Sequence, residues 1–197
     1  MKGHRMEPIV FKREGFAYPS DETFFFVDVE TATRGNDRLC AVGSIIVKGG
    51  QVARYYSLIN PHTPIVNSFI HGIYDHDVVD APTLAEYWRG IAPLLGDDYI
   101  IVGHNISFDI TALTKDLSRF GIPFCPKRKI DTMAVARDIL YRFCTKSGDL
   151  RLNTLCDRLH IALNHHNAES DIGATKEVLE TLLSMGGRDV REFICVR

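Results

Sequence analysis

The sequence predicts an α/β domain built on a mixed five-stranded sheet with helices packed against it. Apolar, aromatic and β-branched runs of strand length alternate with turn residues, and later segments carry apolar positions at helical spacing. The first three runs follow one another through short links, which predicts an antiparallel meander. The last two alternate with helical segments, which predicts parallel pairing. A chain of 197 residues can bury a full core without disulfides or a structural metal.

Local signals delimit the strands. The run TFFFVDV from Thr23 is dense in apolar and aromatic residues and is typical of a buried strand. Gly49-Gly50 is a two-residue hairpin signal because both glycines accept a positive φ, and Asn60-Pro61 ends the meander. We expect strands at residues 23–29, 39–48, 51–59, 99–103 and 127–131.

The helical segments are bounded by residues that start or stop helices. Pro82-Thr83 opens the first long helix and Gly96-Asp97 closes it. Ser107 is expected to cap the next helix, which Gly121 is expected to stop. We expect short helical turns near residues 66–71 and 76–79, and helices over residues 83–96, 108–121, 132–143, 152–159 and 168–185.

The charge balance limits the function classes. Against 25 Asp plus Glu stand 23 Lys plus Arg, a net charge of −2. This balance argues against a protein that binds nucleic acid by bulk charge, although a nucleic-acid enzyme with a local positive field is compatible with it. No apolar run approaches the roughly 18 residues of a membrane span, and the N-terminus lacks an apolar signal-peptide core.

The chain is expected to divide into three segments. Residues 1–22 are mixed and basic and are expected to form a tail or a loosely docked arm. We expect residues 23–185 to form the domain and residues 186–197 a short C-terminal extension.

The cysteines are odd in number and form no CxxC pair, so we expect buried or free thiols in a reducing cytoplasm. They are Cys40, Cys125, Cys144, Cys156 and Cys195.

Four carboxylates stand at the ends of predicted elements. Asp28 and Glu30 end the first strand and share one of its faces, because side chains alternate along a strand. Asp109 lies in the first turn of the helix after the fourth strand. Asp171 lies in the first turns of the last helix, with His166 just before it. Taken singly, each acid is also typical of a solvated strand end or of a helix start, where the helix dipole favours it.

Taken together, the acids indicate a site for two hard divalent cations. Mg²⁺ prefers oxygen ligands in an octahedral shell. Two such ions about 4 Å apart can stabilise the attacking and leaving oxygens of a phosphodiester displacement. A neutral histidine can take the proton from the attacking water. We therefore expect two Mg²⁺ ions, for which Mn²⁺ should be able to substitute.

Three segments carry a family resemblance. FVDVETA, VGHNISFD and HHNAESD, in this order, resemble the three motifs of the DEDDh 3′→5′ exonucleases. The likeness is greatest to the proofreading epsilon subunit of DNA polymerase III and its stand-alone relatives, and it spans roughly residues 23–185. It implies a ribonuclease-H-like fold. It also implies stepwise hydrolysis of single-stranded DNA from the 3′ end, with release of 5′-mononucleotides.

The resemblance also assigns roles by motif position. Asp28 would bridge both metals, Glu30 and Asp171 would hold the metal that activates water, and Asp109 would help to hold the second. His166 would be the general base. A phenylalanine in the substrate pocket could stack against a base of any sequence. The residues implied around the terminal nucleotide are Thr31, Ile70, His71, Asn105 and Phe108.

Other functions remain open from the sequence. The same chemistry would serve an exoribonuclease or an oligoribonuclease-like enzyme, and only a contact to the 2′-OH would distinguish them. A catalytically silent nucleic-acid-binding module and a metalloprotein acting on small phosphoesters are the alternatives from other classes. A polymerase partner is possible. The sequence shows no tethering segment or clamp-binding motif, however, so a stand-alone enzyme is expected.

Overall fold

A mixed β-sheet forms the centre of the protein. The computed structural model describes residues 9–10, 16–141, 150–164 and 167–196. Within these residues the sheet has seven strands in the order β1-β4-β3-β2-β5-β6-β7. They are β1 (Ile9–Val10), β2 (Thr23–Thr31), β3 (Leu39–Lys48), β4 (Gln51–Leu58), β5 (Ile100–Gly103), β6 (Arg128–Asp131) and β7 (Cys195–Val196).

The strand pairing confirms the expected mixed sheet. β2, β3 and β4 form the antiparallel meander, β5 pairs parallel to β2, and β6 pairs parallel to β5. The sequence did not predict β1 and β7, which add two residues each to the sheet edges. A segment of two residues carries no alternation of apolar and polar positions, so no pattern could indicate it.

The expected helices are present. Thr83 starts α2 with a capping box, in which its hydroxyl accepts a hydrogen bond from the Glu86 N–H and Glu86 bonds back to the Thr83 N–H. No helix in the described ranges is both long and apolar enough to cross a membrane. The helices are α1 (Ser68–His71), α2 (Leu84–Leu95), α3 (Ser107–Ser118), α4 (Thr132–Ile139), α5 (Leu152–Leu159) and α6 (Ala168–Gly186), with 3₁₀ turns η1 (Asp75–Asp77) and η3 (Val190–Phe193).

Two helices have boundaries that differ from expectation. Ser107 is the first residue of α3 and does not cap it; the cap position is Ile106, whose backbone is already helical and whose side chain cannot accept a hydrogen bond. The helix ends at Ser118, before Gly121, which adopts a left-handed conformation with φ 68°. The expected helix over residues 132–143 ends at Ile139, and its last two expected residues lie outside the described ranges.

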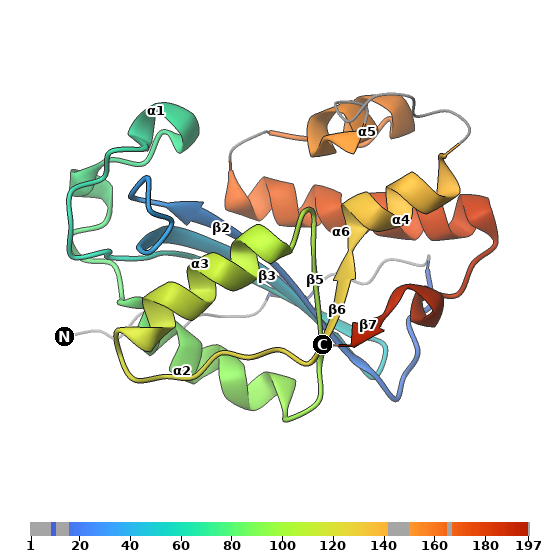
Figure 1. Ribbon diagram of the computed structural model, residues 1–197, viewed down its shortest axis with the longest axis horizontal. Coiled ribbons are helices and arrows are strands. Elements are labelled where there is room, and N and C mark those ends of the chain that lie inside the picture. Colours follow the sequence, from blue (N-terminus) through green and yellow to red (C-terminus); the bar gives the residue numbers. More distant parts are fainter. Residues whose placement is uncertain (1–8, 11–15, 142–149, 165–166, 197) are drawn as a thin grey trace.

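Two helical layers cover the two faces of the sheet (Figure 1). Phe24 and Phe26 of β2 pack in the core formed with α4, α5 and α6. Phe25 and Val27 point to the opposite face and pack in the core formed with α2 and α3. Because side chains alternate along a strand, Asp28 and Glu30 continue the row of Phe24 and Phe26 toward the α6 layer.

The described part of the N-terminal segment docks on the α6 side. Phe16 and Tyr18 pack against the core on that face, and the Tyr18 ring lies 4.9 Å from the Phe24 ring. At the other end, η3 and β7 follow α6, and β7 pairs with β6. The domain boundaries near residues 22 and 185 remain predictions.

The four described cysteines are free thiols, as expected. Cys40 and Cys156 are buried, whereas Cys125 and Cys195 are exposed. Cys195 lies on the short edge strand β7. Cys144 lies outside the described residues.

Candidate active site

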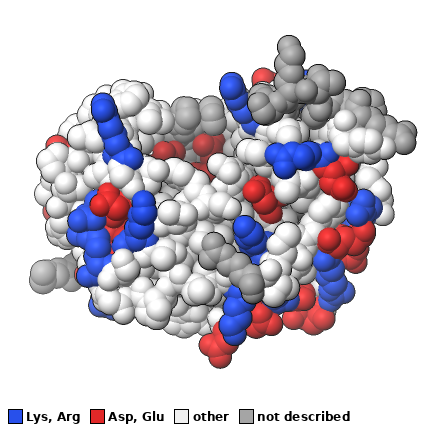
Figure 2. All heavy atoms as spheres, in the orientation of Figure 1, with Lys and Arg blue, Asp and Glu red and all other residues white. Residues whose placement is uncertain are grey.

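Three of the predicted acids meet at the end of β2. Asp28, Glu30 and Asp171 each offer a carboxylate oxygen, and these oxygens all lie within 4.8 Å of one another. The strand supplies the first two from one face, and the start of α6 supplies the third. Oxygen ligands at this spacing suit a hard divalent cation. Figure 2 shows Asp and Glu side chains on the floor of a hollow in this face of the molecule.

A glycine allows α6 to approach the sheet. Gly43 of β3 pairs directly with Asp28. A Cβ atom added to Gly43 would lie 2.1 Å from the carbonyl oxygen of Ala168, the first residue of α6. Only a residue without a side chain fits this approach, which brings Asp171 down onto Asp28. Sequence reasoning did not assign Gly43 to the site, although a glycine inside a strand is a signal for close backbone contact.

Asp109 reaches β2 from the other helical layer. It lies in the first turn of α3 and is only 4% exposed. Its Oδ1 accepts a hydrogen bond of 3.1 Å from the N–H of Val29, the residue between Asp28 and Glu30. Gly103 ends β5 just before this helix. A Cβ there would lie 2.5 Å from Ile106 Cδ1, so this glycine also permits a close turn.

Burial and mutual repulsion raise the pKa values of these acids. Burial is the main cause of the raised pKa of Asp28, and the charges of Asp109, Asp171 and Glu30 add to it. Burial, followed by the charge of Asp171, raises the pKa of Glu30 from 4.5 to about 7. The pKa of Asp109 is also raised by burial, although its backbone hydrogen bonds oppose the shift. Carboxylates arranged this way favour a cation among them.

Two of the predicted pocket residues meet beside the acids. Thr31 is the last residue of β2, and its carbonyl oxygen lies 3.3 Å from Nε2 of His71. Nδ1 of His71 accepts a hydrogen bond from the Ile73 N–H, so we assign the proton to Nε2, which donates to Thr31. Asn67 was not predicted. It is 7% exposed, and its Nδ2 donates to the carbonyl oxygens of Thr31 and Thr33.

The other three pocket residues are exposed to solvent. Ile70 lies on α1, and 42% of its surface is exposed. Phe108 lies in the first turn of α3 and is 40% exposed. Asn105 precedes α3 in a left-handed conformation with φ 61°, and its N–H donates to Oδ1 of Asp131. Their contact with a nucleotide remains a prediction.

Two further histidines belong to the three motifs. The predicted general base, His166, lies outside the described residues. His104, in the same motif as Asp109, has a structural position that the sequence did not indicate. Its Nε2 donates to the carbonyl oxygen of Leu150 and its Nδ1 accepts from the Thr132 hydroxyl, at 2.8 Å each. Burial lowers the pKa of His104, so the ring stays neutral.

A buried thiol near the pocket is unreactive. The Sγ atom of Cys40 lies 3.6 Å from Nε2 of His71. Burial is the main cause that raises the pKa of Cys40 to about 12, and the charge of Glu30 adds to it. The thiolate is the nucleophilic form, so this residue is not a nucleophile at neutral pH.

Comparisons with known proteins agree with this geometry. The profile of the RNase_T family, described as exonuclease, matches residues 25–179. PolC-type DNA polymerase III from Bacillus cereus is 32% identical over 182 residues, which cover 89% of this chain and 12% of the relative. The same protein from Oceanobacillus iheyensis is 34% identical over 169 residues, covering 83% and 12%. The chain thus spans a small part of these relatives.

Solved exonuclease structures share the fold. A full-length 3′-exonuclease superposes with a TM-score of 0.69 at 14% identity, covering 92% of each chain. Escherichia coli Exonuclease I in complex with a dT13 oligonucleotide gives 0.71 at 17% identity, covering 85% of this chain and 42% of that one. The nuclease domain of 3′hExo, a DEDDh family member, gives 0.64 at 13% identity, covering 86% and 94%. These likenesses confirm the ribonuclease-H-like fold, and the family match confirms the expected resemblance to exonucleases.

Proposed function

Because the chain belongs to the RNase_T exonuclease family, we propose that it removes 5′-mononucleotides stepwise from the 3′ ends of single-stranded DNA. The activity of a 3′→5′ exonuclease, a phosphodiester hydrolase, follows from the family. The observation that supports the finer proposal is the convergence of Asp28, Glu30 and Asp171 on one point, with Asp109 tied to the strand between the first two.

The residues present fit two divalent cations. Asp28, Glu30 and Asp171 would hold one ion through oxygens that already lie within 4.8 Å of one another. Asp109 would hold the second together with Asp28, whose pKa responds to the Asp109 charge. Two bound Mg²⁺ or Mn²⁺ ions supply Lewis-acid stabilisation of the attacking and leaving oxygens and lower the pKa of water.

The protein's own side chains position the substrate and move a proton. His166 would accept the proton of the attacking water as general base. The Thr31 end of β2, fixed by Asn67 and His71, would form the floor under the terminal nucleotide. Phe108 presents an exposed ring just before Asp109, where it could stack on a base of any sequence.

DNA is the preferred substrate in this proposal because two comparisons name it. The curated relatives are DNA polymerases, and Exonuclease I was solved with DNA oligonucleotides. RNA is the second candidate. One similar structure concerns recognition of a histone mRNA stem-loop, and another holds rAMP. Matched DNA and RNA oligomers compared by kcat/KM decide between the two.

The relatives also suggest a setting. The matching segment is part of a PolC-type DNA polymerase III in those proteins, so proofreading alongside a polymerase is a second context beside stand-alone action. The described cysteines are free thiols, which supports the expectation of a reducing cytoplasm.

The test follows shortening of a 5′-labelled single-stranded oligonucleotide, with the released mononucleotides identified by chromatography, in Mg²⁺, in Mn²⁺ and in EDTA. We expect a ladder that shortens from the 3′ end in either metal and no product in EDTA. Asp28→Asn should lose at least a hundredfold in kcat. The matched control is Asp97→Asn, an exposed acid before the opposite end of β5, which should keep full activity. No product from the wild type in either metal would refute the proposal.

A further inference from the structure

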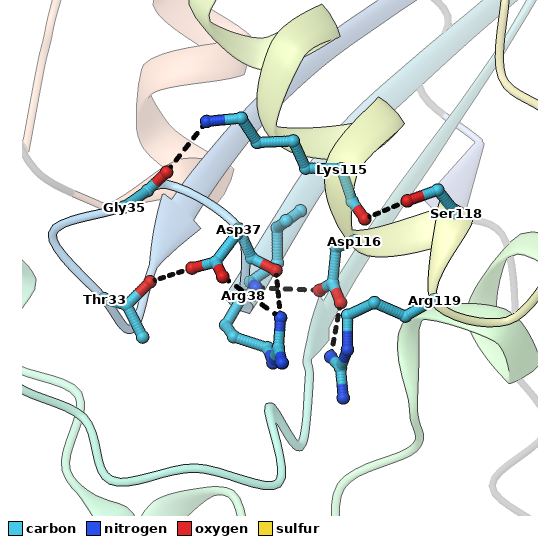
Figure 3. Close-up of polar contacts among 9 residues, drawn as sticks. Thr33, Gly35, Asp37, Arg38, Lys115, Asp116, Ser118 and Arg119 are labelled. Carbon is cyan, nitrogen blue, oxygen red and sulfur yellow. Dashed lines mark hydrogen bonds and ion pairs between the residues drawn. The ribbon is translucent and has the colours of Figure 1, made fainter.

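The loop that follows the catalytic strand is fastened to α3 by specific polar contacts. Residues 32–38 connect β2 to β3 at the end of the sheet that carries Asp28 and Glu30. Lys115 of α3 donates from Nζ to the Gly35 carbonyl oxygen at 3.0 Å (Figure 3). Oδ2 of Asp116, a residue only 1% exposed, accepts from the Leu39 N–H at 2.9 Å. The loop and the helix therefore form one rigid surface.

This surface carries an excess of fixed positive charge. Residues 32–38 and 115–119 contain four cations, Arg34, Arg38, Lys115 and Arg119, and two acids, a net of +4 − 2 = +2, whereas the whole chain carries −2. Figure 2 shows Lys and Arg side chains gathered over this part of the surface, to the left of the hollow.

Neighbouring acids hold two of these cations in place and bond to only part of each guanidinium group. Oδ1 of the buried Asp116 accepts from Nη1 of Arg119 at 2.7 Å. Nη1 of Arg38 donates to the Asp37 carbonyl oxygen at 2.9 Å and lies 3.3 Å from Asp37 Oδ2. Within the described ranges these contacts use only Nη1 of each guanidinium, which carries five N–H donors. Donors therefore remain for a further anion on arginines that are already ordered.

Two of the cations lie farther along the helix that carries Asp109. Asp109 lies in the first turn of α3, and Lys115 and Arg119 follow it by six and ten residues. At about 1.5 Å per residue they lie about 9 and 15 Å along the helix. A stacked strand advances about 3.4 Å per nucleotide, so these distances correspond to roughly three and four nucleotides. A strand whose 3′ end lies at the acids would present its phosphates at this spacing.

We propose that the surface formed by Arg34, Arg38, Lys115 and Arg119 is a backbone-binding track for the single strand upstream of the scissile bond. The inference rests on the proposed function for the position of the 3′ end. The track contacts phosphates and not bases, so it binds DNA and RNA alike and without sequence preference. It would raise affinity for strands several nucleotides long and leave the shortest oligomers unaffected.

The test uses Lys115→Gln, Arg34→Gln and the double variant, with Lys48→Gln as matched control. Lys48 also donates to a backbone carbonyl, that of Leu94 at 3.2 Å, but it pairs with Thr23 at the far end of β2. Fluorescence anisotropy with a labelled twelve-nucleotide oligothymidylate, in Ca²⁺ and over a range of salt concentrations, gives the dissociation constant without turnover. A trinucleotide serves as the short competitor.

Each cation removed from the track should reduce the slope of log Kd against log salt by about 0.7. The double variant should lose about twice that, with weaker binding of the long strand and unchanged binding of the trinucleotide. In the hydrolysis assay, KM for the long strand should rise while kcat stays constant.

An unchanged salt slope, or a loss of affinity no greater than that of Lys48→Gln, overturns the proposed track. Equal loss for the trinucleotide also overturns it. Because binding is measured apart from hydrolysis, failure of the exonuclease proposal appears separately, as absence of product from the wild type.

Discussion

The acid cluster should destabilise the protein when metal is removed, and Glu30→Gln measures this cost. Burial and the charge of Asp171 raise the pKa of Glu30 from 4.5 to about 7. A raised carboxylate pKa favours the protonated form in the folded state. Ionisation therefore costs stability progressively as pH rises from about 4.5 to 7, and the full cost applies above pH 7. A shift of about 2.5 units corresponds to about 3 kcal/mol at pH 8.

The assay is urea unfolding followed by circular dichroism, in EDTA, at pH values from 4 to 8. Glu30→Gln should be more stable than the wild type by up to about 3 kcal/mol at pH 8 and nearly equal to it at pH 4. Adding Mn²⁺ at a hundredfold excess over Kd should stabilise the wild type by about 2.7 kcal/mol and the variant by less. The metal should therefore close or reverse the difference.

The control variant, Glu86→Gln, should change the stability in the opposite direction. Glu86 caps α2, and hydrogen bonds from Thr83 lower its pKa. A lowered carboxylate pKa stabilises the fold above the unfolded pKa, and this contribution is lost as pH falls. Glu86→Gln should therefore be less stable than the wild type at pH 8. A Glu30→Gln variant that is also less stable at pH 8 in EDTA, or whose difference does not grow with pH, refutes the reasoning.

Three further predictions follow from the supporting contacts. Gly43→Ala places a Cβ 2.1 Å from the Ala168 carbonyl oxygen; urea unfolding should show a loss of about 1–3 kcal/mol and kcat should fall at least tenfold. In the control variant Gly173→Ala, the added Cβ on α6 contacts only the flexible end of Arg54, so stability and kcat should both stay unchanged. Asn67→Ala leaves the Thr31 end of β2 without its amide donor, so KM should rise several-fold with metal affinity, measured by calorimetry, unchanged. His104→Phe removes two part-buried hydrogen bonds and should cost about 1–3 kcal/mol in the same unfolding assay.

The strands and the acids were accessible from sequence because their signals are local. Side chains alternate along a strand, so consecutive residues are enough to assign Phe24 to Val27 to two opposite cores. The same alternation places Asp28 and Glu30 on one face. The convergence with Asp109 and Asp171 was predicted from the order of the motifs, since residues more than about 60 positions apart carry no mutual spacing signal. Their predicted roles as ligands and that of His166 as base remain predictions.

The contacts that hold the site together were not accessible in the same way. Asn67 bonds to carbonyl oxygens 34 and 36 residues away, and His104 bonds to Leu150 across 46 residues. An amide or an imidazole has no preferred partner in sequence, so only the packed structure reveals which carbonyl it meets. β3 also shifts register against β2 between Glu30 and Thr31, an irregularity that no residue pattern in the strand indicates.

The site concentrates unfavourable charge where the backbone has least freedom to relieve it. Gly43 holds α6 against β3, Gly103 holds the start of α3 against β2, and Asp109 is bonded to the Val29 N–H. If these supports were loose, the carboxylates would move apart and their pKa values would return toward 4. Burial is the main cause of their raised values and the neighbouring charges add to it, so a cation bound among the acids would offset both costs. Gly43→Ala should consequently lower the pKa of Glu30 and weaken metal binding. A variant that only removes a neighbouring charge should also lower the pKa of Glu30, but it should leave the position of α6 unchanged. Titration of Glu30 by NMR in the Gly43→Ala and Asp171→Asn variants separates the two, because only the first should also shift the amide resonances of α6.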